Sequence, residues 1–183
     1  MRLSASMLAL LLLVGCSQPQ IEEPPASEDT LFGPSAMRIH PIFTQMKDWT
    51  NDGKPDGFEV LLEFQDQFGD PTKASGTVMF ELFDYRQGNP EPRGKRLVNP
   101  WIGSMATLQD QSARWNRTSR TYTFQLSYPQ LNPTKTYVLT AMFRSGTGGR
   151  FFDRVVIEGH EEAPLAPASP PSTAPSTQPT TQP

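Results

Sequence analysis

The sequence has few of the residues that disulfide bonding and catalysis require. Among its 183 residues there is one cysteine, so no disulfide can form within the chain, and there are only two histidines. Positive charge is not in excess, because 16 basic residues face 19 acidic ones. A nucleic-acid-binding domain usually has a strongly basic footprint, and this composition argues against one. No stretch has the spacing of apolar residues that predicts a helix.

Catalytic motifs are missing as well. No Gly-x-Ser-x-Gly turn occurs, and one of the two histidines, His160, lies at the edge of a proline-rich tail. The glycine-rich residues 145–149 (SGTGG) lie between two predicted strands, which is typical of a hairpin turn rather than of a phosphate-binding loop. We therefore predict that the protein is not an enzyme. An enzyme of an unrecognised kind is the less favoured alternative.

The amino terminus has the layout of a secretory signal. One basic residue, Arg2, precedes an apolar run at 7–14, which is shorter than the ~20 apolar residues needed to span a bilayer. The end of this segment reads Leu13, Val14, Gly15 and Cys16. This ending resembles the lipobox of bacterial lipoproteins. The resemblance implies cleavage before Cys16 and acylation of that residue, for example with palmitate. A free cysteine after an ordinary signal or an uncleaved anchor is the alternative.

The composition divides the chain into four parts. Residues 1–15 read as the lipoprotein signal peptide, and 16–36 as the lipidated cysteine followed by a flexible acidic tether interrupted by prolines. A β-sandwich is predicted at 37–160. The Pro, Ser, Thr and Gln of 161–183 cannot bury enough apolar surface to fold, so we expect a disordered tail there. By resemblance to lipoproteins of double-membrane bacteria, Ser17 favours the outer membrane over the inner one.

The middle of the chain alternates apolar and polar residues with a period of two. In the clearest run, FEVLLEFQ at 58–65, every second side chain is apolar. Such alternation is typical of antiparallel strands with one buried face. It predicts about seven strands, at 37–44, 58–65, 77–85, 97–105, 121–128, 136–143 and 151–158. We therefore predict an all-β fold, a single two-layer sandwich.

One connection between predicted strands indicates which type of β-sandwich the chain forms. Leu131, Pro133 and Tyr137 form a Leu-x-Pro-x-x-x-Tyr pattern. Over residues 122–158 the chain resembles the corner before the F strand in fibronectin type III and other immunoglobulin-like domains. The resemblance implies that the Tyr137 hydroxyl bonds back to the chain a few residues upstream. The usual early tryptophan pattern is absent, and a transthyretin-like sandwich is the alternative.

Residues 48–59 (DWTNDGKPDGFE) have the spacing of a calcium-binding loop. Its ligands would be Asp48, Thr50, Asp52, the Lys54 carbonyl, Asp56 and Glu59. Three features weigh against a metal: Thr50 is a neutral ligand, Pro55 lacks the N–H that pairs at its place, and both flanks are predicted strands rather than helices. Turns at Gly53 and Gly57 explain the same residues. We favour turns, with calcium as the alternative and no other cofactor indicated.

Opposite charges are concentrated in successive stretches of the domain. Residues 48–91 contain ten acidic and three basic residues, and 93–154 contain ten basic and two acidic. One predicted partner surface is the basic stretch around a tryptophan, with Arg114, Trp115, Arg117 and Arg120. A second is the outward face of the strand at 77–85, which is unusually apolar at Met79, Phe83 and Tyr85. Strands from the two halves that interleave would instead neutralise the charges.

Together these features predict a cell-envelope lipoprotein that faces away from the cytoplasm and carries a non-catalytic binding or structural domain. Its expected partners are the membrane, through the lipid anchor, and an unidentified envelope protein or polymer, but no nucleic acid. A calcium- or carbohydrate-binding accessory module is the alternative function.

Overall fold

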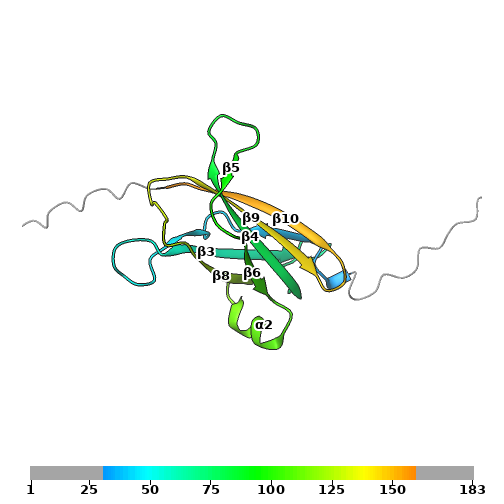
Figure 1. Ribbon diagram of the computed structural model, residues 1–183. Helices are drawn as coiled ribbons and strands as arrows, with labels where there is room; N and C mark the ends of the chain where they lie inside the picture. Colours follow the sequence, from blue (N-terminus) through cyan, green and yellow to red (C-terminus); the bar gives the residue numbers. More distant parts are fainter. Residues whose placement is uncertain (1–30, 160–183) are drawn as a thin grey trace, which may run out of the picture.

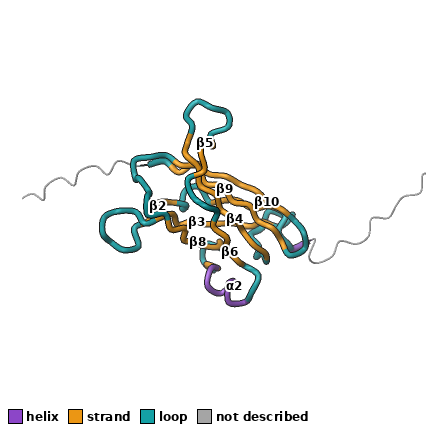
Figure 2. Tube along the Cα trace, in the orientation of Figure 1, coloured by secondary structure: helices purple, strands orange, loops and turns teal. Residues whose placement is uncertain are grey.

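The computed structural model of the protein describes residues 31–159, which form two facing β-sheets with a short helix at one side (Figures 1 and 2). The elements are β1 (Ala36–Ile39), β2 (Gln45–Lys47), β3 (Gly57–Gln65), β4 (Gly76–Tyr85), β5 (Arg93–Arg96), β6 (Trp101–Ser104), α2 (Leu108–Arg114), β7 (Trp115–Asn116), β8 (Thr121–Ser127), β9 (Tyr137–Ser145) and β10 (Arg150–Ile157). The predicted signal peptide, Cys16, most of the tether and the tail at 161–183 lie outside the described residues.

The strands form two antiparallel sheets that pack as a sandwich. One sheet, sheet A, has the order β1-β3-β8-β7, and β2 also pairs with β3. The other, sheet B, has the order β10-β9-β4-β5, and β6 also pairs with β4. All of these pairs are antiparallel. Each sheet thus joins strands from both halves of the chain, because β3 pairs with β8 in sheet A and β4 pairs with β9 in sheet B. The predicted all-β sandwich is confirmed.

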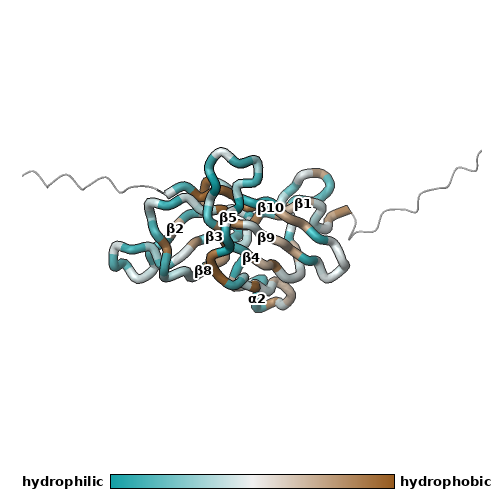
Figure 3. Tube along the Cα trace, turned by 45° about the horizontal axis from the view of Figure 1, so that its top comes forward, coloured by the Kyte–Doolittle hydropathy of each residue, from teal (hydrophilic) through white to brown (hydrophobic). Residues whose placement is uncertain are grey.

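The alternating apolar residues form the core between the sheets. The inward side chains of β3 are fully buried, namely Phe58, Val60, Leu62 and Phe64. Phe64 meets Phe143 of the opposite sheet edge-on, with 4.7 Å between ring centroids. Each large apolar side chain buried in this way contributes roughly 1.5–3 kcal/mol. Polar residues gather instead in the loops after β2 and β4, as Figure 3 shows.

The corner that the sequence predicts before β9 is present. Tyr137, at the start of β9, is 2% exposed, and its ring lies edge-on to Phe58. Its hydroxyl accepts the N–H of Asn132 at 2.9 Å. This hydrogen bond closes the turn between β8 and β9 and fixes the direction in which β9 leaves it.

The helix α2 was not predicted, and the reason lies in its packing. None of its residues is buried, so it has no apolar stripe that could produce helical periodicity. It begins instead at a capping box, in which Thr107 accepts the N–H of Asp110 and the Asp110 carboxylate accepts the N–H of Thr107. That short Thr-x-x-Asp pattern was the available signal.

The count of about seven strands was too low, because short strands border the long ones. The predicted strand at 37–44 ends with β1 at Ile39, where a turn follows in which Thr44 N–H bonds to the His40 carbonyl at 3.0 Å, and β2 begins after this turn as an additional strand. Pro41 lies in this turn and has no N–H for a sheet. The predicted strand at 97–105 is reduced to β6, and β5 and β7 are additional.

Candidate functional site

An apolar row crosses the outer face of sheet B. The strand registers place Phe152 of β10, Met142 of β9, Met79 of β4 and Ile102 of β6 opposite one another. Directly opposed residues point to the same side of a sheet. Ile102 is 66% exposed, Phe152 57% and Met142 40%. We call these four residues, one on each of four adjacent strands, the apolar row; three of them are exposed to solvent and Met79 is half-buried.

Two arginines border one side of the apolar row. Arg144 and Arg150 lie directly opposite each other on β9 and β10, and both are exposed. Together with Thr77, Met79 and Met142 they line a hollow of about 430 Å³. No ion pair within residues 31–159 involves either arginine. This side of the face therefore presents positive charge next to apolar surface.

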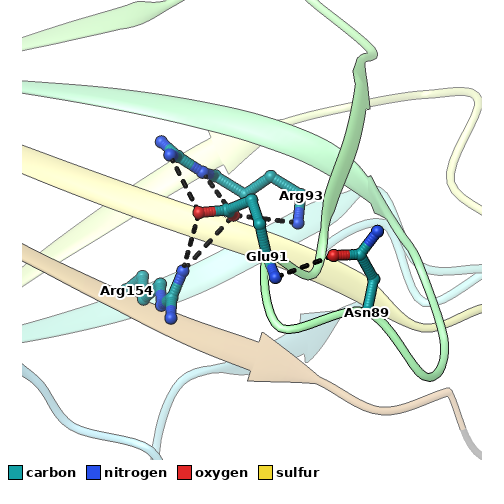
Figure 4. A network of polar contacts seen from close by, with 4 residues as sticks. All are labelled: Asn89, Glu91, Arg93 and Arg154. Atoms are coloured by element: carbon teal, nitrogen blue, oxygen red, sulfur yellow. Dashed lines mark hydrogen bonds and ion pairs between the residues drawn. The ribbon is translucent and has the colours of Figure 1, made fainter.

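On the other side of the apolar row the arginines are already paired. Arg96 of β5 lies 3.0 Å from Glu81 of β4. Glu91, in the β4–β5 loop, contacts both Arg93 at 2.8 Å and Arg154 of β10 at 3.3 Å (Figure 4). The Arg93 hydrogen bonds, with smaller charge effects from Arg93 and Arg154, lower the pKa of Glu91 to about 2. These contacts link the loop to β10 across the sheet.

The predicted partner residues of β4 contribute unequally to this face. Met79 belongs to the apolar row. Phe83 is half-buried, opposite the buried Val138, and the Arg93 guanidinium lies 5.7 Å from its ring centroid. Tyr85 is 39% exposed at the end of the strand. Of the predicted set, Met79 is therefore the residue that the structure joins to other exposed apolar side chains.

The predicted basic surface is divided by the fold. Arg114 lies over the Phe124 ring at 4.6 Å, and its Nε donates to the Ser104 carbonyl. Trp115 is half-buried against Tyr122, with 4.9 Å between ring centroids. Both residues therefore support the fold.

The remaining two residues of that surface, Arg117 and Arg120, are exposed around the turn between β7 and β8. This turn belongs to sheet A, whereas β4 belongs to sheet B. The two predicted partner surfaces are thus carried by different sheets.

In the predicted calcium loop, carboxylates bind backbone N–H groups. Asp48 accepts the N–H of Asn51 at 2.7 Å and of Gly53 at 2.8 Å, and Asp56 accepts the N–H of Thr50 at 2.9 Å. Partial desolvation raises the pKa of Asp48, but these N–H bonds hold it below its ordinary value. Gly53 has a φ of 84°, which favours glycine.

Two further proposed calcium ligands also have structural roles within the fold. Asp52 accepts the N–H of Lys54 at 2.9 Å, and Glu59 lies within β3, opposite Gln45 of β2. In the part of the chain that the structure describes, no group of three or more His, Cys, Asp or Glu side chains is placed to hold a metal ion. Calcium binding stays the alternative to the turns that we favour, and a titration can test it.

The described histidine has no acid–base partner. His40 packs against Phe43 with the two rings tilted and 4.7 Å between their centroids, and its buried Nδ1 has no hydrogen bond. The other histidine, His160, lies outside the described residues.

Comparisons with known protein families, with curated proteins and with solved structures found no match to this chain. Between residues 31 and 159, no helix is long and apolar enough to cross a membrane.

Proposed function

We infer that this protein is a lipid-anchored component of the bacterial envelope whose sandwich binds another envelope protein or polymer without catalysis. The lipobox-like ending at Cys16 supports the anchor. The apolar row on sheet B supports the binding function, and it is the single observation that carries it. Exposed apolar patches of this kind, bordered by polar groups, are typical of interaction sites.

The anchor would hold the sandwich at the membrane face away from the cytoplasm. Each buried CH₂ of an acyl chain contributes about 0.8 kcal/mol, and more than one chain gives stable attachment. The residues between Cys16 and the sandwich would connect the domain to the lipid anchor. Ser17 favours the outer membrane in a double-membrane cell.

Replacement of the cysteine tests the anchor. The wild-type protein should incorporate labelled palmitate and partition into the detergent phase. Cys16→Ser should block lipidation and the cleavage that depends on it, so that a heavier precursor remains. A chain that begins at Ser17 behind an ordinary signal should be found in the soluble fraction. If this chain remains with membranes in high salt, a second anchor exists and the proposed mode of attachment is wrong.

Photo-crosslinking in intact cells tests the binding face. A photoreactive residue at position 102, in the apolar row, should give a discrete adduct that disappears when Met142→Asp is added. The matched control is position 108, since Leu108 is 90% exposed on α2 but lies outside the row. Equal adducts at both positions, or an adduct at 102 that persists in Met142→Asp, would contradict binding through this face.

A further inference from the structure

The pair Arg144 and Arg150 is unusual for a sheet. Like charges directly opposite each other on neighbouring strands destabilise the pair. Other arginines on this face, Arg96 and Arg154, each contact a glutamate, whereas no ion pair to Arg144 or Arg150 exists among residues 31–159. The pair is therefore available to carboxylates from outside the described part of the chain.

The hollow next to these arginines combines two kinds of surface. Its lining contains the two guanidinium groups, the hydroxyl of Thr77 and the two methionines of the apolar row, Met79 and Met142. Methionine side chains adapt to irregular apolar partners. The surface therefore suits an extended segment that carries several carboxylates and a small number of apolar side chains.

The chain itself enters the sandwich beside this hollow. Phe32, Gly33 and Pro34 line a cleft together with residues 145–147, the turn between β9 and β10. The Phe32 carbonyl accepts the hydroxyl of Thr72 at 2.8 Å, which fixes the entry point. Since Arg144 and Arg150 flank the same turn, the residues that precede Phe32 start close to the arginine pair.

We propose that residues 21–29 of this chain (IEEPPASED) lie across the outer face of sheet B. The segment contains four carboxylates and no basic residue; the carboxylates belong to Glu22, Glu23, Glu28 and Asp29. They pair with Arg144 and Arg150, while Ile21 and the prolines cover part of the apolar row. Because proline has no N–H for a sheet, side chains rather than strand pairing make the contact.

The reach of the segment is sufficient. Nine extended residues span roughly 30 Å, whereas the three gaps between four adjacent strands add up to about 14 Å. Attachment to the same domain also raises the local concentration of the segment to the millimolar range. Modest contacts are therefore enough to keep it on the face.

Other occupants fit less well. The acidic residues Glu161 and Glu162 follow Gly159, which lies against the backbone of residues 133–135. That point is at the far end of β10, about 23 Å along the strand from Arg150. A second copy would offer the same face, on which Glu81 and Glu91 already have arginine partners. The acidic segment before residue 31 is the occupant that the charges and the chain path favour.

A docked segment would compete with an envelope partner for the apolar row. In that role the inference rests on the proposed function, because it adds an internal competitor to the same binding face. Neutralising the segment should then increase the adduct formed at position 102. If docking fails but that adduct still forms, the binding function stands without the competitor.

Methyl NMR of the methionines tests the docking. The protein is the chain from Ser17 to Pro183, which retains every core residue, from Met37 to Ile157. In a variant with Glu22→Gln, Glu23→Gln, Glu28→Gln and Asp29→Asn, the methyl signals of Met79 and Met142 should shift, while that of Met46 on sheet A stays in place. The matched control, Glu161→Gln with Glu162→Gln, should move none of them.

A peptide supplied in trans completes the test. At millimolar concentration, a peptide of residues 17–30 should restore the Met79 and Met142 signals of the neutralised chain, and Arg144→Gln with Arg150→Gln should prevent this. Unchanged methionine signals in the neutralised chain would overturn the proposal. Signals that shift with protein concentration equally in both chains would also overturn it, since they identify a second copy as the occupant.

Discussion

The hydroxyl of Tyr122 donates a hydrogen bond to Oε1 of Gln111 at 2.5 Å, and this contact joins α2 to sheet A. The Gln111 amide nitrogen donates in turn to the carbonyls of Ala74 and Met105, each at 2.7 Å. A helix without a buried residue is thereby held by polar side chains, of which Gln111 reaches furthest into the fold and Arg114 donates to the Ser104 carbonyl.

Gln111→Ala should accordingly lower the free energy of unfolding by about 1–3 kcal/mol, because the Tyr122 hydroxyl and the Ala74 and Met105 carbonyls each lose a hydrogen bond to Gln111. Gln109→Ala on the same helix is the matched control, since Gln109 is exposed, and should cost far less. Urea unfolding of both variants measures the difference. Equal stabilities would mean that Gln111 does not hold the helix.

The hydrogen bond from Asn132 to Tyr137 gives a second prediction. Tyr137→Phe should lower the free energy of unfolding by about 1–2 kcal/mol, since the N–H of Asn132 loses the half-buried hydroxyl that accepts it. Tyr128→Phe serves as the control, because the Tyr128 hydroxyl has no hydrogen-bond partner among residues 31–159. If chemical denaturation shows no loss of stability in Tyr137→Phe, the corner does not stabilise the fold.

Calcium should bind the loop at 48–59 only weakly. The Asp48 and Asp56 carboxylates already accept N–H bonds, so a metal would have to displace them. We expect a dissociation constant above about 100 μM, in the range of weak extracellular sites. Titration calorimetry measures it. Micromolar binding that is lost in Asp52→Ala would establish a calcium site and refute this expectation.

The Glu91 contacts predict a local response to acid. The folded-state pKa is about 2, below the ordinary value of 4.5, so the contacts favour the folded state fully above pH 4.5 and lose this effect as the pH falls through about 2. NMR of the Glu91 side-chain carboxyl follows the titration. Because Arg93 is the largest cause, Arg93→Gln should move the midpoint toward 4.5 more than Arg154→Gln does; the reverse order would contradict the assignment.

Two features of the sequence predicted the fold: the alternation of apolar and polar residues, and one corner motif. The period-two pattern at 58–65 depends only on which side chains are buried, and the buried set of β3 confirms it. The corner at Leu131 to Tyr137 is local, so it could be read without knowledge of distant strands. The helix α2 was not predicted because polar side chains such as Gln111 hold it in place, and a polar residue adds nothing to an apolar pattern.

The candidate binding face was only partly visible in the sequence. The sequence showed an unusually apolar outward face at Met79, Phe83 and Tyr85, but Met142, Phe152 and Ile102 belong to other strands. Their alignment depends on register, which is fixed by long-range pairing rather than by local sequence. For the same reason, the charges of Arg144 and Arg150 could not be distinguished from those of paired arginines before the strands were placed.

The entry and exit of the described chain have a mechanical consequence. Phe32 lies by the β9–β10 turn, whereas Gly159 lies against residues 133–135 at the opposite end of these strands. A pull between the two points runs along the strands, and the antiparallel hydrogen bonds lie across that direction. The bonds of β1 with β3 and of β10 with β9 would thus share the load in shear instead of opening one after another, the arrangement in which a sandwich best resists tension.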